Sequence, residues 1–268
     1  MTAPELGRFR LIVQYDGRPF LGWQRQKVGR TVQAELEETL NQLTGERRPV
    51  TGAGRTDRGV HALGQVASVE VPSTWSAAKL RTAMNALLPP EIWIQEAQRT
   101  PACFHPRRDA VSRTYEYRLG LVEAAASPMV GRWCWNVSRN PPDPEILARA
   151  AEGIPGDRSF RKFAKSGQPH LGEQCRVTSA EWAPWDGPGL RFRITANRYL
   201  HHMVRYLVGT MVDVGRARRS LEEMDELLVH PESSLTTSPP APPQGLFLFR
   251  VEYPPERLGE DPDRDPAH

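Results

Sequence analysis

The chain has 268 residues, with 35 Lys and Arg against 32 Asp and Glu, and a net charge of +3 at pH 7. This length suffices for one large or two medium-sized domains with a substantial core. It contains no run of about 18 apolar residues, and Met1 to Arg10 lack an apolar stretch, so we expect neither a membrane span nor a secretory signal. Three scattered cysteines, Cys103, Cys134 and Cys175, indicate a reduced cytoplasmic chain rather than a disulfide framework or a zinc site.

Basic side chains gather in short clusters although the net charge is small. A folded chain that brought such clusters to one face would bind a polyanion such as RNA, whereas a mixed-charge surface is the alternative that charge alone leaves open. The clusters are Arg47–Arg48, Arg55 with Arg58, Arg107–Arg108, Arg158 to Lys165, Arg191 to Arg205 and Arg216 to Arg219.

Periodicity predicts alternating strands and helices in the first part of the chain. Apolar residues alternate with polar ones from Phe9 to Tyr15, which predicts a strand, and Asp16-Gly17 is typical of a hairpin turn after it. Thr31 is placed to cap a helix that ends near Gly45. Further strands are expected at 49–53, 64–71, 92–97 and 113–119, with a helix between Ser76 and Pro89.

The second part of the chain shows a similar style of elements. We expect a helix from Asp143-Pro144 to Gly153, a hairpin of 176–182 with 190–196, a long helix from about Tyr199 to Val214, a helix opened by the capping box of Ser220 and Glu223, and a strand from Leu246 to Val251. Elements in this order favour an α+β protein with mainly antiparallel sheets and two similar halves. The Pro-rich, charged segment after Tyr253 is typical of a disordered tail.

One segment, Gly52 to Ala62, is the strongest candidate for chemistry. It reads Gly-Ala-Gly-Arg-Thr-Asp-Arg-Gly-Val-His-Ala, so its glycines surround one carboxylate, Asp57. An aspartate in such a turn is most often a turn former that bonds its own backbone. Here Arg55 and Arg58 supply positive charge that keeps Asp57 ionised or holds a phosphate. A loop with this much charge between two predicted strands indicates a carboxylate displayed to a polyanionic substrate.

Several motifs in the same order resemble the tRNA pseudouridine synthase A family, over about residues 8–253. The central motif is Gly54-Arg55-Thr56-Asp57-X-Gly59-Val60-His61-Ala62. The others are Tyr15-Asp16-Gly17 with Phe20, Gly22-Trp23-Gln24-Arg25-Gln26, Asn85 to Pro89, Phe104-His105-Pro106-Arg107, Arg113-Thr114-Tyr115-Glu116-Tyr117, Phe160-Arg161-Lys162-Phe163, Ala196 to Arg205 and Ala241 to Leu246.

The resemblance implies the fold and the activity. It implies the pseudouridine synthase fold, with ferredoxin-like repeats, in which two halves, residues 8–120 and 121–253, flank an active-site cleft. Residues 254–268 are the tail that composition predicts to be disordered. The resemblance also implies a homodimer that isomerises uridine to pseudouridine at positions 38, 39 and 40 of the tRNA anticodon stem-loop, without cofactor or metal. Two departures are Arg58, where a small residue is usual, and Arg198-Tyr199, where Gly-Phe is common.

By resemblance, the catalytic set is Asp57, Tyr115 and Arg205. Asp57 either attacks C1′ of the ribose or removes its 2′ proton, two pathways that the sequence leaves open. Tyr115 would line the uracil pocket, although alternation also places it with Tyr117 and Leu119 on one face of a strand, where aromatic residues usually belong to the core. Arg205 would form a salt bridge that orients Asp57, or would be a helix-surface arginine.

The resemblance and the charge pattern also indicate residues that bind substrate. Arg55 would help to extrude the uridine, Phe20 and Leu246 would form apolar pocket walls, and Arg58 would affect RNA entry. His61 is a loop scaffold or a phosphate contact. The adjacent His201 and His202 would point apart on a helix, so no metal site is expected there. Candidate phosphate contacts are Arg107, Arg108, Arg161, Lys162 and Lys165.

Two other functions compete with the isomerase. The arginine clusters alone would serve a non-catalytic RNA-binding or chaperone module, which would bind tRNA without turnover. A carboxylate-based nucleosidase would release free uracil, but such enzymes usually need two acids, and the Gly52–Ala62 motif contains one.

Overall fold

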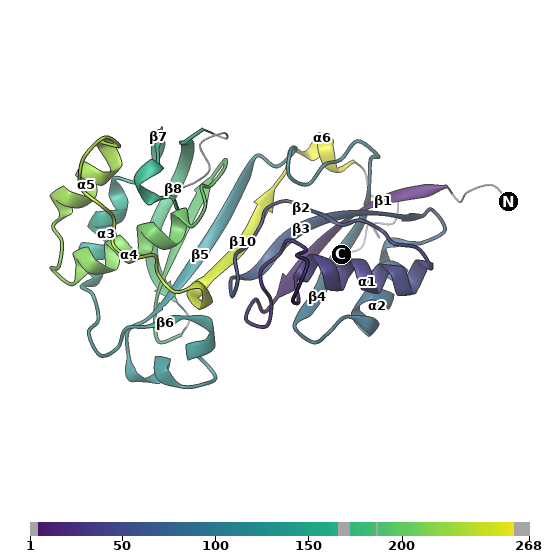
Figure 1. The fold of residues 1–268 in the computed structure, drawn as a ribbon, viewed down its shortest axis with the longest axis horizontal. Coiled ribbons are helices and arrows are strands. Elements are labelled where there is room, and N and C mark those ends of the chain that lie inside the picture. The colour runs from purple at the N-terminus through teal and green to yellow at the C-terminus, as the bar shows by residue number, and fades with distance from the viewer. Residues whose placement is uncertain (1–4, 166–171, 186, 260–268) are drawn as a thin grey trace. The chain divides into compact units, whose positions relative to one another are not determined.

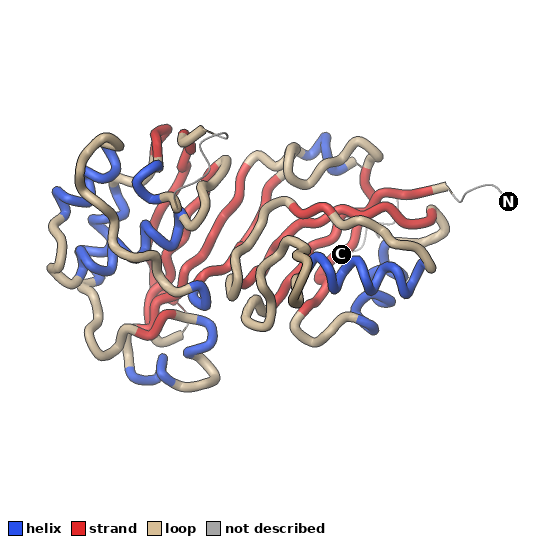
Figure 2. The backbone as a smooth tube through the Cα atoms, viewed as in Figure 1, coloured by secondary structure: helices blue, strands red, loops and turns tan. Residues whose placement is uncertain are grey.

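The computed structural model describes residues 5–165, 172–185 and 187–259 (Figure 1). The chain forms two compact units, Met1–Val111 with Leu248–His268, and Ser112–Phe247. The sequence placed the division at residue 120 and assigned the last strand to the second half, whereas the division falls at Val111 and most of that strand returns to the first unit. Figure 2 shows that both units combine strands and helices, which confirms the predicted α+β class.

The first unit is built on a sheet with strand order β4-β1-β3-β10. Its strands are β1 (Leu6–Tyr15), β2 (Thr51–Gly52), β3 (His61–Pro72), β4 (Ile92–Thr100) and β10 (Leu246–Glu252, in this unit from Leu248). β1 runs antiparallel to both β3 and β4, with Leu6 opposite Pro72 and Tyr15 opposite Ala62. The short β2 pairs with β3. β3 begins at His61, within the Gly52–Ala62 segment, and so ties the end of that segment to the sheet.

Helices α1 (Val32–Thr44) and α2 (Ala77–Leu87) lie beside the sheet of the first unit (Figure 1). α1 begins where Thr31 Oγ1 accepts the Ala34 N–H and ends at Gly45, which has a left-handed φ of 72°. α2 is capped by Ser76 in the same way. The apolar stripes of both helices and the alternating residues of β1 form the core, in which Phe9, Leu11, Val13, Leu36, Leu40, Leu80 and Met84 are fully buried.

The second unit has a sheet with strand order β5-β9-β8-β7. Its strands are β5 (Ser112–Gly120), β6 (Trp135–Asn136), β7 (Gly156–Ser159), β8 (Gln174–Trp185) and β9 (Gly189–Ala196), and its α-helices are α3 (Pro144–Glu152), α4 (Met203–Gly215) and α5 (Leu221–Val229). β9 runs antiparallel to both β5 and β8, and β8 runs antiparallel to β7. The short β6 pairs with β5 in parallel. The predicted caps of α3 at Asp143 and of α5 at Ser220 are confirmed.

Three local predictions are wrong. Asp16-Gly17 forms no hairpin, because β1 pairs with β3 and β4 and the chain instead enters a loop that leads to α1. The long helix begins at Met203 rather than Tyr199, because His202 has a left-handed φ of 64° that interrupts helical geometry. Within the predicted disordered tail, Pro255–Leu258 form the short helix α6, and residues 260–268 lie outside the described part of the chain.

Candidate active site

Asp57 opens a tight turn immediately before β3. The Val60 N–H donates to the Asp57 carbonyl at 3.1 Å, and Gly59 has a φ of 78°, a conformation that glycine adopts without a Cβ penalty. Asp57 itself is half-buried, while the neighbouring Arg58 is exposed. The turn therefore keeps the carboxylate near the surface and leaves Arg58 in contact with solvent.

Two glycines of the loop after β1 pack directly against the backbone of this turn. A Cβ on Gly22, where φ is 102°, would lie 2.6 Å from the Thr56 carbonyl oxygen, and a Cβ on Gly17 would lie 1.9 Å from that of Val60. The Trp23 N–H donates to the Thr56 carbonyl at 3.0 Å. The two loops thus approach more closely than side chains would allow, which fixes the backbone on both sides of Asp57.

Buried polar side chains fasten the same turn to β1 and to the loop after it. The Thr56 Oγ1 and the Tyr15 hydroxyl are 2.8 Å apart, and His61 Nδ1 accepts the Gly17 N–H at 3.1 Å. The Asp16 carboxylate lies 3.3 Å from the same ring nitrogen. His61 is fully buried, so its contacts here support the scaffold interpretation rather than the phosphate contact.

The pKa of Asp16 is set by opposing effects. Burial raises the pKa, but the side-chain and backbone hydrogen bonds from Arg18, together with the positive charge of its guanidinium, outweigh it and hold the pKa below the ordinary value of 3.8. Arg18 reaches the carboxylate through Nε at 3.0 Å and through its backbone N–H at 3.1 Å. Asp16 therefore remains ionised at neutral pH and organises the loop that supports the Asp57 turn.

Arg55 is exposed, as a residue that meets RNA must be. Its Nε donates to the Gln24 Oε1 at 3.1 Å, a contact that the sequence did not indicate. Phe20 and Leu246, the two predicted apolar walls of the pocket, are both buried. Phe20 is 1% exposed, with the Arg30 guanidinium 5.0 Å from its ring centre, and Leu246 is 6% exposed. Their role in a uracil pocket stays a prediction.

Tyr115 lies on β5 in the second unit, half-buried, whereas Tyr117 on the same strand is fully buried in the core. The ring of Tyr199 meets that of Tyr115 edge-on, with centroids 4.8 Å apart and planes at 77°. The Tyr199 hydroxyl lies 2.9 Å from the Arg113 carbonyl oxygen and 2.7 Å from that of Ile194, and burial raises its pKa well above the usual value. Tyr199, which the sequence marked only as a departure from the family pattern, thus supports the Tyr115 ring.

Arg205 lies in the first turn of α4, rather than in the middle of a helix as predicted. Its Nε donates to the Ala241 carbonyl at 2.6 Å, and the Ala241 N–H donates to the Arg205 carbonyl at 2.9 Å. These bonds hold the segment before β10 against α4. Asp57 belongs to the first unit and both Tyr115 and Arg205 to the second, so the salt bridge to Asp57 stays a prediction.

His201 and His202 do not point apart. Their ring centres are 4.1 Å from each other, and the His202 Nε2 is 3.5 Å from Arg205 Nη1. The expectation assumed a helix, but both residues precede α4 and the left-handed backbone of His202 turns the two rings to the same side. His202 therefore lies beside Arg205 at the beginning of the helix.

The candidate phosphate contacts fall into two groups. Arg107, Arg108, Arg161 and Lys165 are exposed, and Arg161 Nε lies 3.6 Å from Glu173 Oε1 in an ion pair. Lys162 differs because its ammonium group donates to the carbonyls of Ser233 and, at 3.1 Å, Leu235. These bonds give Lys162 a structural role in the second unit, and its contact with phosphate stays a prediction.

Comparison with known proteins identifies the class to which these features belong. A family model described as tRNA pseudouridine synthase matches residues 11–107 and 150–254. Among curated relatives, the tRNA pseudouridine synthase A of Geobacter sp. (strain M21) is 34% identical over 91% of this chain and 98% of its own. The enzyme of Syntrophomonas wolfei is 35% identical over 93% of this chain and 98% of its own. The enzyme of Chlorobium phaeobacteroides is 38% identical over 91% of this chain and 93% of its own.

The chain therefore belongs to the tRNA pseudouridine synthase family and is an isomerase that converts uridine to pseudouridine in tRNA. A solved structure, a Cbf5-Nop10-Gar1 complex, aligns with 93% of this chain and 58% of its own at a TM-score of 0.34 and 10% identity, a likeness too distant to add to the assignment. Within the described residues, no helix is long and apolar enough to cross a membrane.

Proposed function

We propose that this enzyme acts on uridines 38, 39 and 40 of the anticodon stem-loop and that Asp57 is its catalytic carboxylate. The observation that carries the proposal is the Asp57 turn, whose backbone is held on both sides by Gly17 and Gly22. A carboxylate on so constrained a backbone is preorganised for reaction with a ribose, which a mobile turn former would not be.

The reaction needs neither energy input nor redox chemistry. The bond from uracil N1 to ribose C1′ breaks, the base turns within the pocket, and C5 joins C1′. The C5 proton then leaves and N1 gains a proton, so atoms and charge balance. One carboxylate suffices, because it can stabilise the developing positive charge at C1′ by attack there, or by removing the 2′ proton, and the base never leaves the enzyme.

Tyr115 and Arg205 complete the proposed catalytic set. The half-buried Tyr115 ring, supported edge-on by Tyr199, would be the platform on which uracil stacks. Arg205 would orient Asp57 through a charge-assisted hydrogen bond. Arg55 would fill the place of the extruded uridine, and the exposed arginines Arg58, Arg107 and Arg161 would contact phosphates. We also propose that the active species is a cytoplasmic homodimer.

Replacement of Asp57 tests the proposal. We expect Asp57→Asn and Asp57→Ala to fold and bind tRNA but to release tritium from 5-tritiated uridine at least about 10²–10⁴-fold more slowly than the wild type. Asp225→Asn, which removes an exposed carboxylate on α5, is the matched control and should retain the wild-type rate. Normal turnover by either Asp57 variant would exclude the assignment, and release of free uracil would indicate a nucleosidase.

A further inference from the structure

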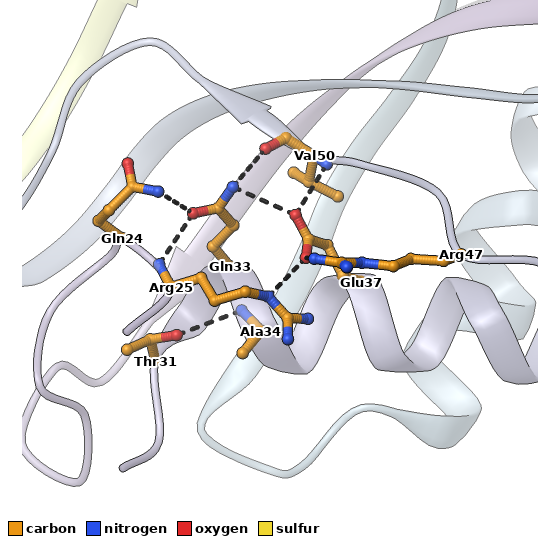
Figure 3. A network of polar contacts seen from close by, with 8 residues as sticks. All are labelled: Gln24, Arg25, Thr31, Gln33, Ala34, Glu37, Arg47 and Val50. Atoms are coloured by element: carbon orange, nitrogen blue, oxygen red, sulfur yellow. Dashed lines mark hydrogen bonds and ion pairs between the residues drawn. The ribbon is translucent and has the colours of Figure 1, made fainter. Parts of the chain in front are cut away.

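A buried carboxylate on α1 forms the centre of a polar network in the first unit (Figure 3). The Glu37 side chain is 4% exposed. Its Oε1 accepts the Val50 N–H at 3.2 Å and the Gln33 Nε2 at 3.2 Å, and its Oε2 accepts Arg25 Nε at 2.7 Å. Arg47 Nη2 lies 3.7 Å from the same oxygen. An ionised carboxylate accepts hydrogen bonds but donates none, so every group that faces it must be a donor.

This requirement sets the orientation of the Gln33 amide. Its NH₂ group faces Glu37 and also donates to the Val50 carbonyl at 2.9 Å, so its oxygen points the other way. That oxygen accepts the Arg25 backbone N–H at 2.9 Å. Backbone groups have fixed donor and acceptor roles. The Arg25 N–H and the Val50 carbonyl therefore require the same orientation of the Gln33 amide as the carboxylate does.

The orientation is passed on to Gln24. The Gln24 Nε2 donates to the Gln33 Oε1 at 2.8 Å, so the Gln24 oxygen is turned toward Arg55, whose Nε donates to it at 3.1 Å (Figure 3 shows the part from Gln24 to Glu37). Three consecutive hydrogen bonds therefore join a buried negative charge to the guanidinium two residues before Asp57. With either amide reversed, two donors or two acceptors would face each other.

We propose that Glu37, Gln33 and Gln24 are positioning residues that hold Arg55 ready to enter the RNA helix. The charge of Glu37 orients both amides, and the last one fixes the Nε edge of Arg55 so that the rest of the guanidinium is presented to a base or phosphate. The rotamer freedom of an exposed arginine is thereby restricted before RNA binds. This proposal rests on the proposed function, because the step that it serves is extrusion of the target uridine.

A double-mutant cycle tests the last link of the network. In single-turnover reactions, we expect Gln24→Met to lower the rate of pseudouridine formation about tenfold, the effect of losing one hydrogen bond to a charged group. Its affinity for tRNA should change by less than about twofold. In the Arg55→Ala background, Gln24→Met should have no further effect on the rate. A merely structural Gln24 would give equal losses in both backgrounds, and that result, or a wild-type rate for Gln24→Met, would overturn the proposal.

Two more variants test the origin of the orientation. Glu37→Gln keeps the shape but removes the charge, and Gln33→Met interrupts the network without touching the Glu37 ion pairs. Each variant should lower the turnover rate when Arg55 is present and should have no effect in the Arg55→Ala background. Urea unfolding measures the stability of each variant separately. If Glu37→Gln does not fold, Gln33→Met decides, and a rate loss that persists without Arg55 would refute the proposal.

The matched control is Gln14→Met, since Gln14 Nε2 donates to Gln95 Oε1 at 3.1 Å in an amide pair that, within the described part of the chain, shares no hydrogen bond with Arg55. It should react at the wild-type rate. The wild-type chain separates the two proposals. If it forms pseudouridine at positions 38, 39 or 40 but the network variants match it, only the positioning role fails, whereas a wild-type chain without product at these positions overturns both.

Discussion

The two units hold their proposed active-site residues by different means. In the first, the backbone around Asp57 is fixed by the backbone of another loop, at Gly17 and Gly22, where no side chain fits. In the second unit, the side chains themselves make the contacts. The Tyr115 ring packs against the Tyr199 ring, and the Arg205 guanidinium donates to the Ala241 carbonyl. A carboxylate that reacts must be placed to within a fraction of an ångström, whereas a ring that stacks tolerates small shifts. The comparison therefore predicts that changes in the first unit cost more activity.

Among changes to residues that support the proposed catalytic set, the largest effect is expected for Gly22→Ala. The new methyl group would lie 2.6 Å from the Thr56 carbonyl oxygen at a φ of 102°, so the Asp57 turn must move, and a displacement of this size costs about 10²-fold in rate. Gly45→Ala is the control, because Gly45 also has a positive φ of 72° but has nothing within 4 Å of a Cβ. It should lose about 1 kcal/mol of stability and no activity. Equal rates for the two variants in tritium release would contradict the comparison.

A smaller effect is expected at Tyr199 in the second unit. Tyr199→Phe keeps the ring but loses the hydroxyl, whose single proton is shared between two backbone carbonyls, so it should lower the free energy of unfolding by about 1 kcal/mol and leave turnover near the wild-type value. Tyr199→Leu also removes the edge-on contact, worth about 0.5–1.5 kcal/mol, and should slow turnover several-fold. Urea unfolding and steady-state kinetics measure both. If Tyr199→Phe were the slower enzyme, the ring contact would not be what positions Tyr115.

The smallest effect is expected for Asp16, in the loop after β1, and it is a pH-dependent change in the free energy of unfolding. Because the folded-state pKa of Asp16 lies below 3.8, its ionised form stabilises the fold above pH 3.8, and this contribution is lost as the pH falls through the folded-state value. We expect Asp16→Asn to be about 0.5–1 kcal/mol less stable at pH 7, discounted for partial exposure, with the difference shrinking below pH 4. Urea unfolding from pH 7 to pH 3 measures it, with Asp225→Asn as control. A difference that grew in acid would show that Asp16 is not stabilising as a carboxylate.

The sequence by itself determined those features whose causes are local. The hydroxyl of Thr31 and the left-handed Gly45 bound α1, Asp143-Pro144 starts α3, and Ser220 with Glu223 starts α5. These signals lie within one helical turn of the element that they limit, so they can be read without knowledge of the fold. The position of Asp57 in a tight glycine turn before a strand was predictable for the same reason.

Only the tertiary structure decided how these pieces meet. Gly17 looked like part of a hairpin because its close approach to Val60, 43 positions later, leaves no local trace. The glutamates of the stretch Glu35–Glu38 do not reveal that Glu37 is the one among them that is buried and bonded to Gln33 and Arg25. Close backbone packing and the direction of a buried hydrogen-bond network depend on atoms that distant segments bring together, and neither periodicity nor composition encodes those distances.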